Sequence, residues 1–347
     1  MKKVMGLFLI ACVTLFGCSQ AGDKQETIKV GMVTDVAGID DGSFSELAWK
    51  GVNKFAEEYN KQSGKTVEIQ YVTPKDTALT ELTSNIDNLI MARNKIIVVA
   101  GFAFEEAVGI SATEHKDVDF ILIDGEPLVD GKYVSLDNVV SVKFKENEAG
   151  FLAGVATALE SKTGKVGYLG GIEVPAVVSY GVGFNYGVEY ANEHLGTDVT
   201  VTDYIYSGTF TDFSLGQMLS AGMFDKGVDI IMATAGVATQ GAISEAKQRG
   251  DVYIVGCDSN QYQDGMTDNG DSVVLTSAMK HIDVVVDNLL EEWSMDKFQG
   301  GKTISTGITS DSVGLPSNNP NLTTNNSNKL EDVKQLLKNG EIVVPFE

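Results

Sequence analysis

The stretch from Ile96 to Asp124, IIVVAGFAFEEAVGISATEHKDVDFILID, holds two short apolar runs separated by a segment long enough for a helix. Ile96–Ala100 and Asp119–Asp124 have the pattern of strands buried on both faces, and Glu105–His115 predicts the helix between them. Strands that alternate with helices in this way form a parallel sheet that helices cover on both faces. This stretch therefore predicts an α/β fold.

The same alternation continues on both sides of this stretch. Toward the N-terminus it predicts strands at 28–34 and 66–72 and helices at 43–62 and 79–93. After a bridging region at 132–144, a second series predicts helices at 146–161, 174–195, 212–226 and 237–249 and strands at 165–170, 199–206, 228–234 and 252–258. Two series of this size predict two doubly wound parallel-sheet lobes joined by a hinge. We expect residues 28–140 plus 258–283 to form the N-terminal lobe, and residues 141–257 plus 284–347 the C-terminal lobe.

The first seventeen residues predict a lipoprotein signal peptide. Lys2 and Lys3 precede the apolar stretch 4–16, which is shorter than the about 20 residues that a membrane-spanning helix needs. Gly17 directly precedes Cys18, so cleavage would leave Cys18 as the lipidated first residue of the mature chain. The alternative is an ordinary secretory signal with an incidental cysteine. Residues 18–27 are expected to be a lipidated tether, which would hold the protein at the extracytoplasmic face of the cell membrane.

The chain is strongly acidic, with 48 Asp and Glu against 26 Lys and Arg and a net charge of −22. A surface of this sign repels phosphate backbones and anionic lipid headgroups. We therefore expect no nucleic-acid partner, and membrane attachment through the lipid alone. Cys12 lies in the signal and Cys18 would be acylated, so Cys257 is left without a partner for an internal disulfide.

Charged side chains follow several predicted strands at the carboxyl ends, where open parallel sheets bind their ligands. Asp35 follows the first strand, Asp124 and Asp258 close two apolar strands, and Lys280 ends the strand after that. Carboxylates at these places suit a ligand rich in hydroxyl donors. Asp124 is also well suited to cap a helix. Lys280 fits two roles equally well: a partner that keeps these carboxylates ionised, or a solvated surface lysine. The corresponding loops of the second series are 170–171, 207–210 and 235–237.

Phe44 lies in the first turn of the helix predicted at 43–62, where Ser43 and Glu46 have the spacing of a capping box. The ring would stack on a planar ligand if it faces the cleft between the lobes. It would belong to the core if it continues the apolar stripe of its helix, as aromatic residues at helical spacing usually do. The spacing alone does not decide between the two.

Motifs of common enzyme classes are missing from the sequence. No G-x-x-x-x-G-K-[ST] loop and no G-x-S-x-G nucleophile elbow occur, and the three histidines lack zinc-binding spacing. A hydrolase would need an acidic metal-holding cluster or a general acid beside its leaving group, and the sequence points to neither. We expect a binding protein without catalytic residues, metal or cofactor.

A series of ordered motifs resembles the basic membrane protein family, purine nucleoside receptor-like lipoproteins that serve ABC importers. The first is VGMVTDVAGIDDGSFSELAW at 30–49, and DFILID at 119–124 is the second. The others are GFNYG at 183–187, SGTFTD at 207–212, GVATQG at 236–241, VGCDSN at 255–260, LTSAMK at 275–280 and NGEIVVP at 339–345. The resemblance therefore extends over essentially the whole chain after the signal.

The resemblance implies a type I periplasmic-binding-protein fold, in which aromatic rings hold a base and carboxylates and a lysine hold the ribose. It places Asp35 at the base edge and Phe44 as the stacking ring from the first lobe. It implies aromatic partners from the second lobe at Phe184 and Phe210, with Tyr180 or Tyr186 of the same helix as the alternatives to Phe184. It also implies a ribose group formed by Asp124, Gly236, Asp258 and Lys280.

Two positions depart from the family pattern. Gly42 stands where many relatives carry a basic residue, and Ser45 where many carry Asn, whose amide offers two donors that serine lacks. The preference for purines over pyrimidines is therefore left open. The implied function is capture of a nucleoside by a monomeric lipoprotein that delivers it to ABC permease subunits. Ligand sensing without transport, and binding of another neutral solute such as a sugar, are the alternatives.

Overall fold

Every side chain of strand β3 (Ile96–Ala100) is buried, because helices cover both faces of the sheet around it. Ile97 and Val99 face one layer, and Ile96 and Val98 face the opposite one. Each such side chain contributes about 1.5–3 kcal/mol when it is fully removed from water. The computed structural model describes residues 27–346, so the predicted signal peptide, Cys18 and nearly all of the tether lie outside the described residues.

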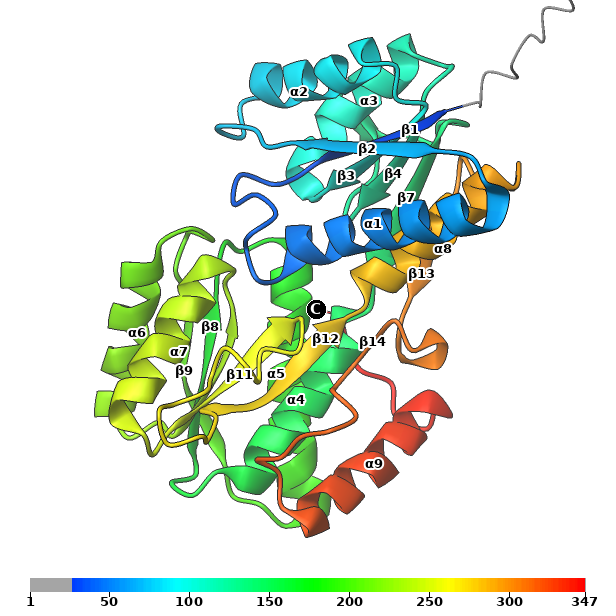
Figure 1. Ribbon diagram of the computed structural model, residues 1–347. Helices are drawn as coiled ribbons and strands as arrows, with labels where there is room; N and C mark the ends of the chain where they lie inside the picture. Colours follow the sequence, from blue (N-terminus) through cyan, green and yellow to red (C-terminus); the bar gives the residue numbers. More distant parts are fainter. Residues whose placement is uncertain (1–26, 347) are drawn as a thin grey trace, which may run out of the picture.

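The first sheet has the strand order β13-β7-β4-β3-β1-β2, and all its strand pairs are parallel. Helices α2 and α3 cover one face, and helices α1 and α8 cover the other (Figure 1). Its elements are β1 (Ile28–Val33), α1 (Phe44–Ser63), β2 (Val67–Val72), α2 (Leu79–Met91), β3, the 3-10 turn η1 (Phe102–Phe104), α3 (Glu105–Glu114), β4 (Asp119–Ile123), β7 (Val139–Phe144), α8 (Ile282–Ser294) and β13 (Thr303–Thr306), with a small hairpin of β5 (Leu128–Val129) and β6 (Lys132–Tyr133) beside them.

The second sheet has the order β14-β12-β11-β10-β8-β9, with only β14 antiparallel to its neighbour among the described strands of this sheet. Helices α4 and α5 cover one face, and α6 and α7 the other. Its elements are α4 (Glu146–Glu160), β8 (Lys165–Gly170), α5 (Pro175–Leu195), β9 (Thr200–Tyr206), α6 (Phe213–Asp225), β10 (Ile230–Thr234), α7 (Val237–Arg249), β11 (Tyr253–Asp258), β12 (Val274–Lys280), β14 (Val313–Gly314) and α9 (Thr324–Lys338). The predicted α/β class with two parallel-sheet lobes is confirmed.

The chain crosses between the lobes three times: between β7 and α4, between β12 and α8, and through the turn η2 (Ile308–Ser310) between β13 and β14. The first lobe is therefore residues 28–144 plus 282–306, and the second is residues 146–280 plus 313–346. The predicted boundaries were wrong for three elements, β12, α8 and β13, and the predicted division after residue 140 falls inside β7. Strand β12 pairs with β11 in the second sheet, whereas helix α8 packs on α1 in the first lobe. An apolar strand can extend either sheet, so its sequence does not show which one it joins.

Glycines explain the close contact between α4 and α5. A Cβ added at Gly154 would lie 2.2 Å from the carbonyl oxygen of Phe184, and one at Gly187 would lie 2.1 Å from that of Phe151. The glycine-rich run at 181–187 therefore serves helix packing, which requires its backbone to approach the neighbouring helix.

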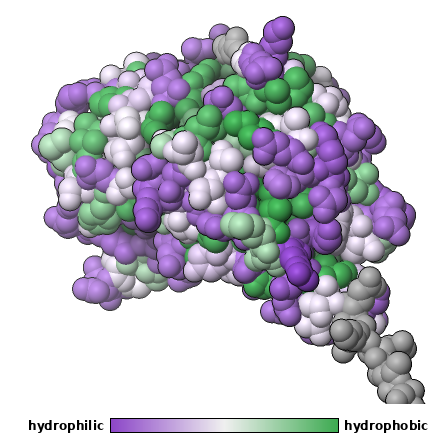
Figure 2. Space-filling model, turned by 90° about the horizontal axis from the view of Figure 1, so that it is seen from above, coloured by the Kyte–Doolittle hydropathy of each residue, from purple (hydrophilic) through white to green (hydrophobic). Residues whose placement is uncertain are grey.

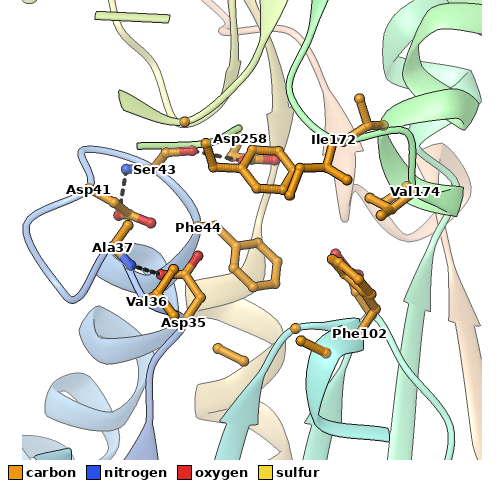
Figure 3. A pocket seen from close by; sticks show the side chains of 18 of the residues that line it. Asp35, Val36, Ala37, Asp41, Ser43, Phe44, Phe102, Ile172, Val174 and Asp258 are labelled. Atoms are coloured by element: carbon orange, nitrogen blue, oxygen red, sulfur yellow. Dashed lines mark hydrogen bonds between the residues drawn. The ribbon is translucent and has the colours of Figure 1, made fainter. Parts of the chain in front are cut away.

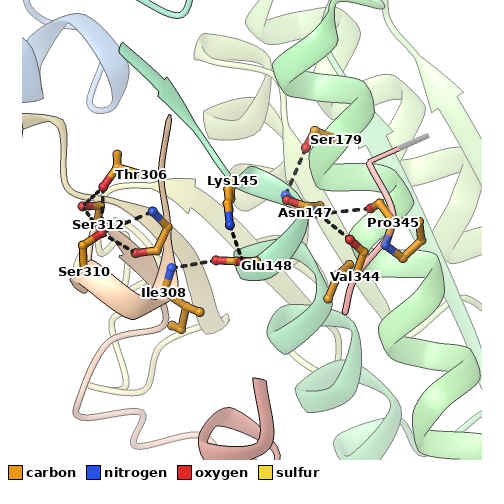
Figure 4. A network of polar contacts seen from close by, with 11 residues as sticks. Lys145, Asn147, Glu148, Ser179, Thr306, Ile308, Ser310, Ser312, Val344 and Pro345 are labelled. Atoms are coloured by element: carbon orange, nitrogen blue, oxygen red, sulfur yellow. Dashed lines mark hydrogen bonds and ion pairs between the residues drawn. The ribbon is translucent and has the colours of Figure 1, made fainter. Parts of the chain in front are cut away.

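Side chains at the start of α4 tie the first crossing to two other parts of the chain (Figure 4). Oε2 of Glu148 accepts the backbone N–H of Ile308, on the third crossing, at 2.7 Å. The amide nitrogen of Asn147 donates to the carbonyl oxygens of Val344 at 2.9 Å and Pro345 at 3.1 Å. The first crossing is thus bonded both to the third crossing and to the end of the chain.

The face that the first lobe presents from above carries hydrophilic residues interspersed with apolar ones (Figure 2). Single apolar residues on a surface are common in globular proteins. Within residues 27–346, no helix combines the length and the apolar character needed to cross a membrane.

Candidate ligand site between the lobes

The order of strands reverses next to β1 in the first sheet and next to β8 in the second, and ligands of such sheets bind beyond the strand ends at these points. A cavity of about 190 Å³ lies there between the lobes. One water needs roughly 10–15 Å³ on this measure, so the space suits a small organic molecule. Seven of the eight predicted ligand-binding residues line it: Asp35, Phe44, Asp124, Phe210, Gly236, Asp258 and Lys280.

Aromatic rings from both lobes wall the cavity. Phe44 comes from the first turn of α1 and Phe102 from η1 (Figure 3). Phe210 comes from the loop after β9. The ring of Phe210 packs so closely on Gly171 that a Cβ there would lie 2.2 Å from it. All three rings are only partly buried, so they offer faces to a ligand.

Helix α1 begins differently from the predicted capping box. The side chain of Ser43 makes no capping hydrogen bond. The carboxylate of Asp41 accepts the backbone N–H groups of Ser43 at 3.0 Å, Ser45 at 2.8 Å and Glu46 at 3.1 Å. A carboxylate satisfies the unpaired N–H groups of a helix start and complements its dipole. Ser43 is thereby free to bond elsewhere in the site.

Asp35 lies just beyond β1 and faces the cavity with its carboxylate held by a local turn. Its Oδ1 accepts the N–H of Ala37 at 2.9 Å, while its own backbone N–H donates to Oγ of Ser45 at 3.2 Å. Burial raises the pKa of Asp35 to about 6, and the nearby carboxylate of Asp41 adds to this rise. Ser45 is fully buried and faces the backbone of Asp35, so the acceptor at this edge of the cavity is Asp35 itself.

Asp35→Asn is expected to raise the free energy of unfolding by about 1–3 kcal/mol at pH 7.5, because the ionised carboxylate is costly to bury. The folded-state pKa lies above the unfolded value, so this cost is present above about pH 6 and is lost as the pH falls toward 4. Urea unfolding should therefore show a much smaller gain at pH 5.0. Asp76→Asn is the matched control. Asp76 accepts the N–H of the residue two positions on, Ala78, as Asp35 accepts that of Ala37, but Asp76 is exposed. An equal gain in both variants, or at both pH values, would contradict the explanation.

Asp258 ends β11, and both of its carboxylate oxygens have protein partners. Oδ2 accepts the hydroxyl of Ser43 from the first lobe at 2.7 Å, and Oδ1 accepts the hydroxyl of Tyr180 from α5 at 3.0 Å. Beside them, Oγ of Ser259 donates to the carbonyl oxygen of Gly42 at 2.7 Å. These bonds join the loop before α1 to the second lobe.

Lys280 is 1 % exposed and lies between two carboxylates. Its ammonium donates to Oδ2 of Asp124 and, at 2.8 Å, to Oε1 of Glu146, and it lies 5.3 Å from the ring centre of Phe44. Burial alone would lower the pKa of Lys280, but the carboxylates of Asp124 and Glu146 raise it above its usual range. The lysine is therefore a buried, charged member of the site, and the solvated alternative is excluded.

Asp124 keeps one oxygen without a partner. Among the described residues no group donates to its Oδ1, which is buried. Buried acceptors are nearly always paired, so a free one beside a cavity points to a ligand donor. Asp124 does not cap a helix, since the hairpin strand β5 follows it.

Asp124 and Asp258 share a backbone conformation that few residue types adopt. Their φ angles are 58° and 59°, in the left-handed region. Such strain often accompanies function, and Asp tolerates it better than most side chains. The two lobes thus present their carboxylates at equivalent strand ends in the same way.

Phe184 is the predicted site residue that does not reach the cavity. Its side chain is fully buried in the core of the second lobe, with its ring centre 6.1 Å from that of Tyr168 on β8. The glycines around it bring α4 and α5 together, so this face of α5 points into the core. Tyr180, one turn earlier, lines the cavity instead.

Sequence reasoning missed Phe102 and Glu146. Phe102 follows the carboxyl end of β3, so the rule that identified the other loops would have found it. Glu146 carried no signal, because the first residue of a helix is a common place for an acidic side chain.

Carboxylates of Glu58, Asp287 and Glu291 lie close enough together to share a metal ion. The ammonium of Lys54, however, already pairs with Asp287. The arrangement is explained as an ion pair between α1 and α8.

Comparison with known proteins shows relatives along the whole described chain. The family model described as ABC transporter substrate-binding protein PnrA-like matches residues 28–347. The CD4+ T-cell-stimulating antigen of Listeria innocua is 30% identical, covering 98% of this chain and 95% of the relative. The ABC transporter nucleoside-binding protein BmpA of Lactococcus lactis is 27% identical, covering 90% of this chain and 91% of the relative. A solved ABC transporter solute-binding protein from Aeropyrum pernix superposes with a TM-score of 0.77 at 25% identity, covering 92% and 94%.

Proposed function

The chain belongs to the PnrA-like family of ABC transporter substrate-binding proteins, and we propose that its ligand is a nucleoside. The observation that carries this proposal is the pairing of aromatic walls with a free carboxylate oxygen in one cavity. The rings of Phe44 and Phe210 offer flat faces to a base, and Oδ1 of Asp124 offers an acceptor to a sugar hydroxyl. The name of the Lactococcus lactis relative, which states nucleoside binding, supports the same ligand class.

The charges around the cavity favour a nucleoside over a nucleotide. Lys280 is the only basic residue among the described residues that line it, and two carboxylates already neutralise its ammonium. A phosphate would meet the carboxylates of Asp35 and Asp258 with no free cation beside it. Burying such an unpaired charge is strongly unfavourable.

The proposed roles follow from the positions of the side chains. Asp35 would accept N–H donors from the edge of the base, and Phe102 would add a third ring to the stacking pair. The ribose would lie at the end of the cavity formed by Asp124, Gly236, Asp258 and Lys280. No bond of the ligand is made or broken in this proposal.

The proposed site of action is the extracytoplasmic face of the cell membrane, with the mature protein anchored by a lipid on Cys18. The lobes would close on the nucleoside by a hinge motion at the three crossings, and the closed protein would deliver it to an ABC permease.

Calorimetric titration of the purified protein tests the ligand class. We expect heat of binding with nucleosides and none with the matching nucleotides. Phe44→Ala should weaken nucleoside binding about 10- to 100-fold, since stacking on an aromatic side chain contributes about 1–3 kcal/mol per base. Phe213→Ala is the control, because Phe213 is an exposed phenylalanine on α6 that does not line the cavity. No heat with any nucleoside, or unchanged affinity in Phe44→Ala, would refute the proposal.

Labelling of cells with radioactive palmitate tests the anchor. The unaltered protein should carry the label and sediment with membranes, whereas Cys18→Ser should do neither. A labelled Cys18→Ser protein would show that the anchor lies elsewhere.

A further inference from the structure

Glu146 lies behind the ligand site and does not line the cavity. It is the first residue of α4, directly after the first crossing, and its side chain is 5% exposed. Its Oε1 accepts from the ammonium of Lys280 at 2.8 Å. A carboxylate buried to this degree has to be paired, and Lys280 is the partner.

Glu146 and Lys280 belong to the same lobe. Helix α4 packs on α5, β12 and α9, and Lys280 is the last residue of β12 in the second sheet. Asp124, the other partner of the ammonium, follows β4 in the first lobe. A hinge rotation that separates the lobes would therefore part Lys280 from Asp124 and leave Lys280 paired with Glu146.

The ammonium divides its bonds between two carboxylates. It donates to Oδ2 of Asp124 and to Oε1 of Glu146, and Oδ1 of Asp124 has no donor among the described residues. Without Glu146 the ammonium would be free to turn fully toward Asp124 and engage both of its oxygens. Oδ1 of Asp124 thus stays free for a ligand because the carboxylate of Glu146 also binds the ammonium of Lys280.

We infer that Glu146 is a positioning residue: it holds Lys280 in the cleft so that, on closure, Asp124 pairs with the ammonium through one oxygen and presents the other to a ligand hydroxyl. The inference rests on the proposed nucleoside function and deepens it. It makes Glu146 a determinant of the preference for hydroxylated sugars, because a deoxy analogue leaves a buried acceptor unpaired.

Glu146→Gln tests this by comparing a ribonucleoside with its 2′-deoxy and 3′-deoxy analogues in calorimetric titrations at pH 7.5. We expect the ribonucleoside to lose about tenfold or more in affinity while the deoxy analogue that lacks the contacting hydroxyl loses much less, so the preference shrinks. Glu146→Asp keeps the negative charge and should restore part of the preference for the ribonucleoside. Glu160→Gln, at the far end of the same helix, should match the unaltered protein.

Parallel losses for the ribonucleoside and both analogues in Glu146→Gln would indicate a merely structural role and overturn the inference. A crystal structure of the unaltered protein with its lobes apart provides a test that needs no variant to fold. Lys280 should then remain bonded to Glu146 and be separated from Asp124, and the reverse would overturn the inference. If the unaltered protein binds no nucleoside, the proposed function itself fails, and the inference with it.

Discussion

Replacing Lys280 with methionine is expected to lower the free energy of unfolding by about 3–5 kcal/mol at pH 7.5, because removing one partner of a buried ion pair leaves an uncompensated charge. The carboxylates of Asp124 and Glu146 would both lose the buried cation that neutralises them. Methionine fills a similar volume, so the loss of the charge dominates over the loss of packing. Urea unfolding of the purified variant measures the effect.

The pH dependence of this loss has a definite sign. Burial raises the pKa of Glu146 above its usual range, whereas Lys280 lowers it. Without Lys280 the pKa of Glu146 should rise further. Its carboxylate would then take up a proton, and lose its charge, at a higher pH than in the unaltered protein. A carboxyl group with a raised folded-state pKa costs stability in full above that pKa, and the cost shrinks as the pH falls from there toward the unfolded-state pKa. The destabilisation of Lys280→Met should therefore be smaller at pH 5.5 than at pH 7.5.

Lys226→Met provides the control for the lysine replacement. Lys226 pairs with Asp203, but its side chain is 62% exposed, so the change should cost less than about 1 kcal/mol. A loss below about 1 kcal/mol in Lys280→Met as well would show that the buried cluster tolerates its missing cation.

Asp124→Asn is expected to weaken binding of a ribonucleoside about 10- to 100-fold, since hydrogen bonds to charged groups contribute about 1.5–3 kcal/mol. Asparagine has nearly the same shape and tolerates the left-handed backbone at this position, so the charge is the main change. Titration calorimetry measures the effect, and the preference over deoxy analogues should shrink with it. Asp130→Asn is the matched control, because Asp130 has a φ of 51° but is exposed outside the cavity.

Asp258→Asn should have a smaller effect than Asp124→Asn, about three- to tenfold. Ser43 and Tyr180 already occupy the two oxygens of Asp258, whereas Oδ1 of Asp124 has no partner among the described residues. Hydrogen bonds that are already satisfied in the protein leave less to gain from a ligand. The opposite order would show that Asp258 releases its protein partners when the ligand binds.

The alternation of strands and helices was enough to predict the two sheets, because buried parallel strands such as β3 and β4 are apolar on both faces. It did not place β12 and α8 in their lobes. The lobe that each element joins depends on which sheet edge is free after the second sheet has formed, which is a property of the whole fold. The local sequence pattern does not determine it.

The position of a residue after a strand predicted the site better than its side-chain type did. Asp35, Asp124 and Asp258 all follow strand ends and all line the cavity. Phe184 lies inside a helix, and there the rotation of the helix decides whether a ring meets the ligand or the core. Glycine contacts with α4 fix that rotation, and they form only in the folded protein.

The left-handed backbone at Asp124 and Asp258 limits how this receptor can diversify. Glycine, asparagine and aspartate adopt that conformation more readily than most residues. A single nucleotide change converts an aspartate codon into a codon for either of the other two. Lineages that acquire a different cargo are therefore expected to pass through asparagine or glycine here. Divergent copies should show these three residues at both positions far more often than glutamate, which carries the same charge but does not suit the turn.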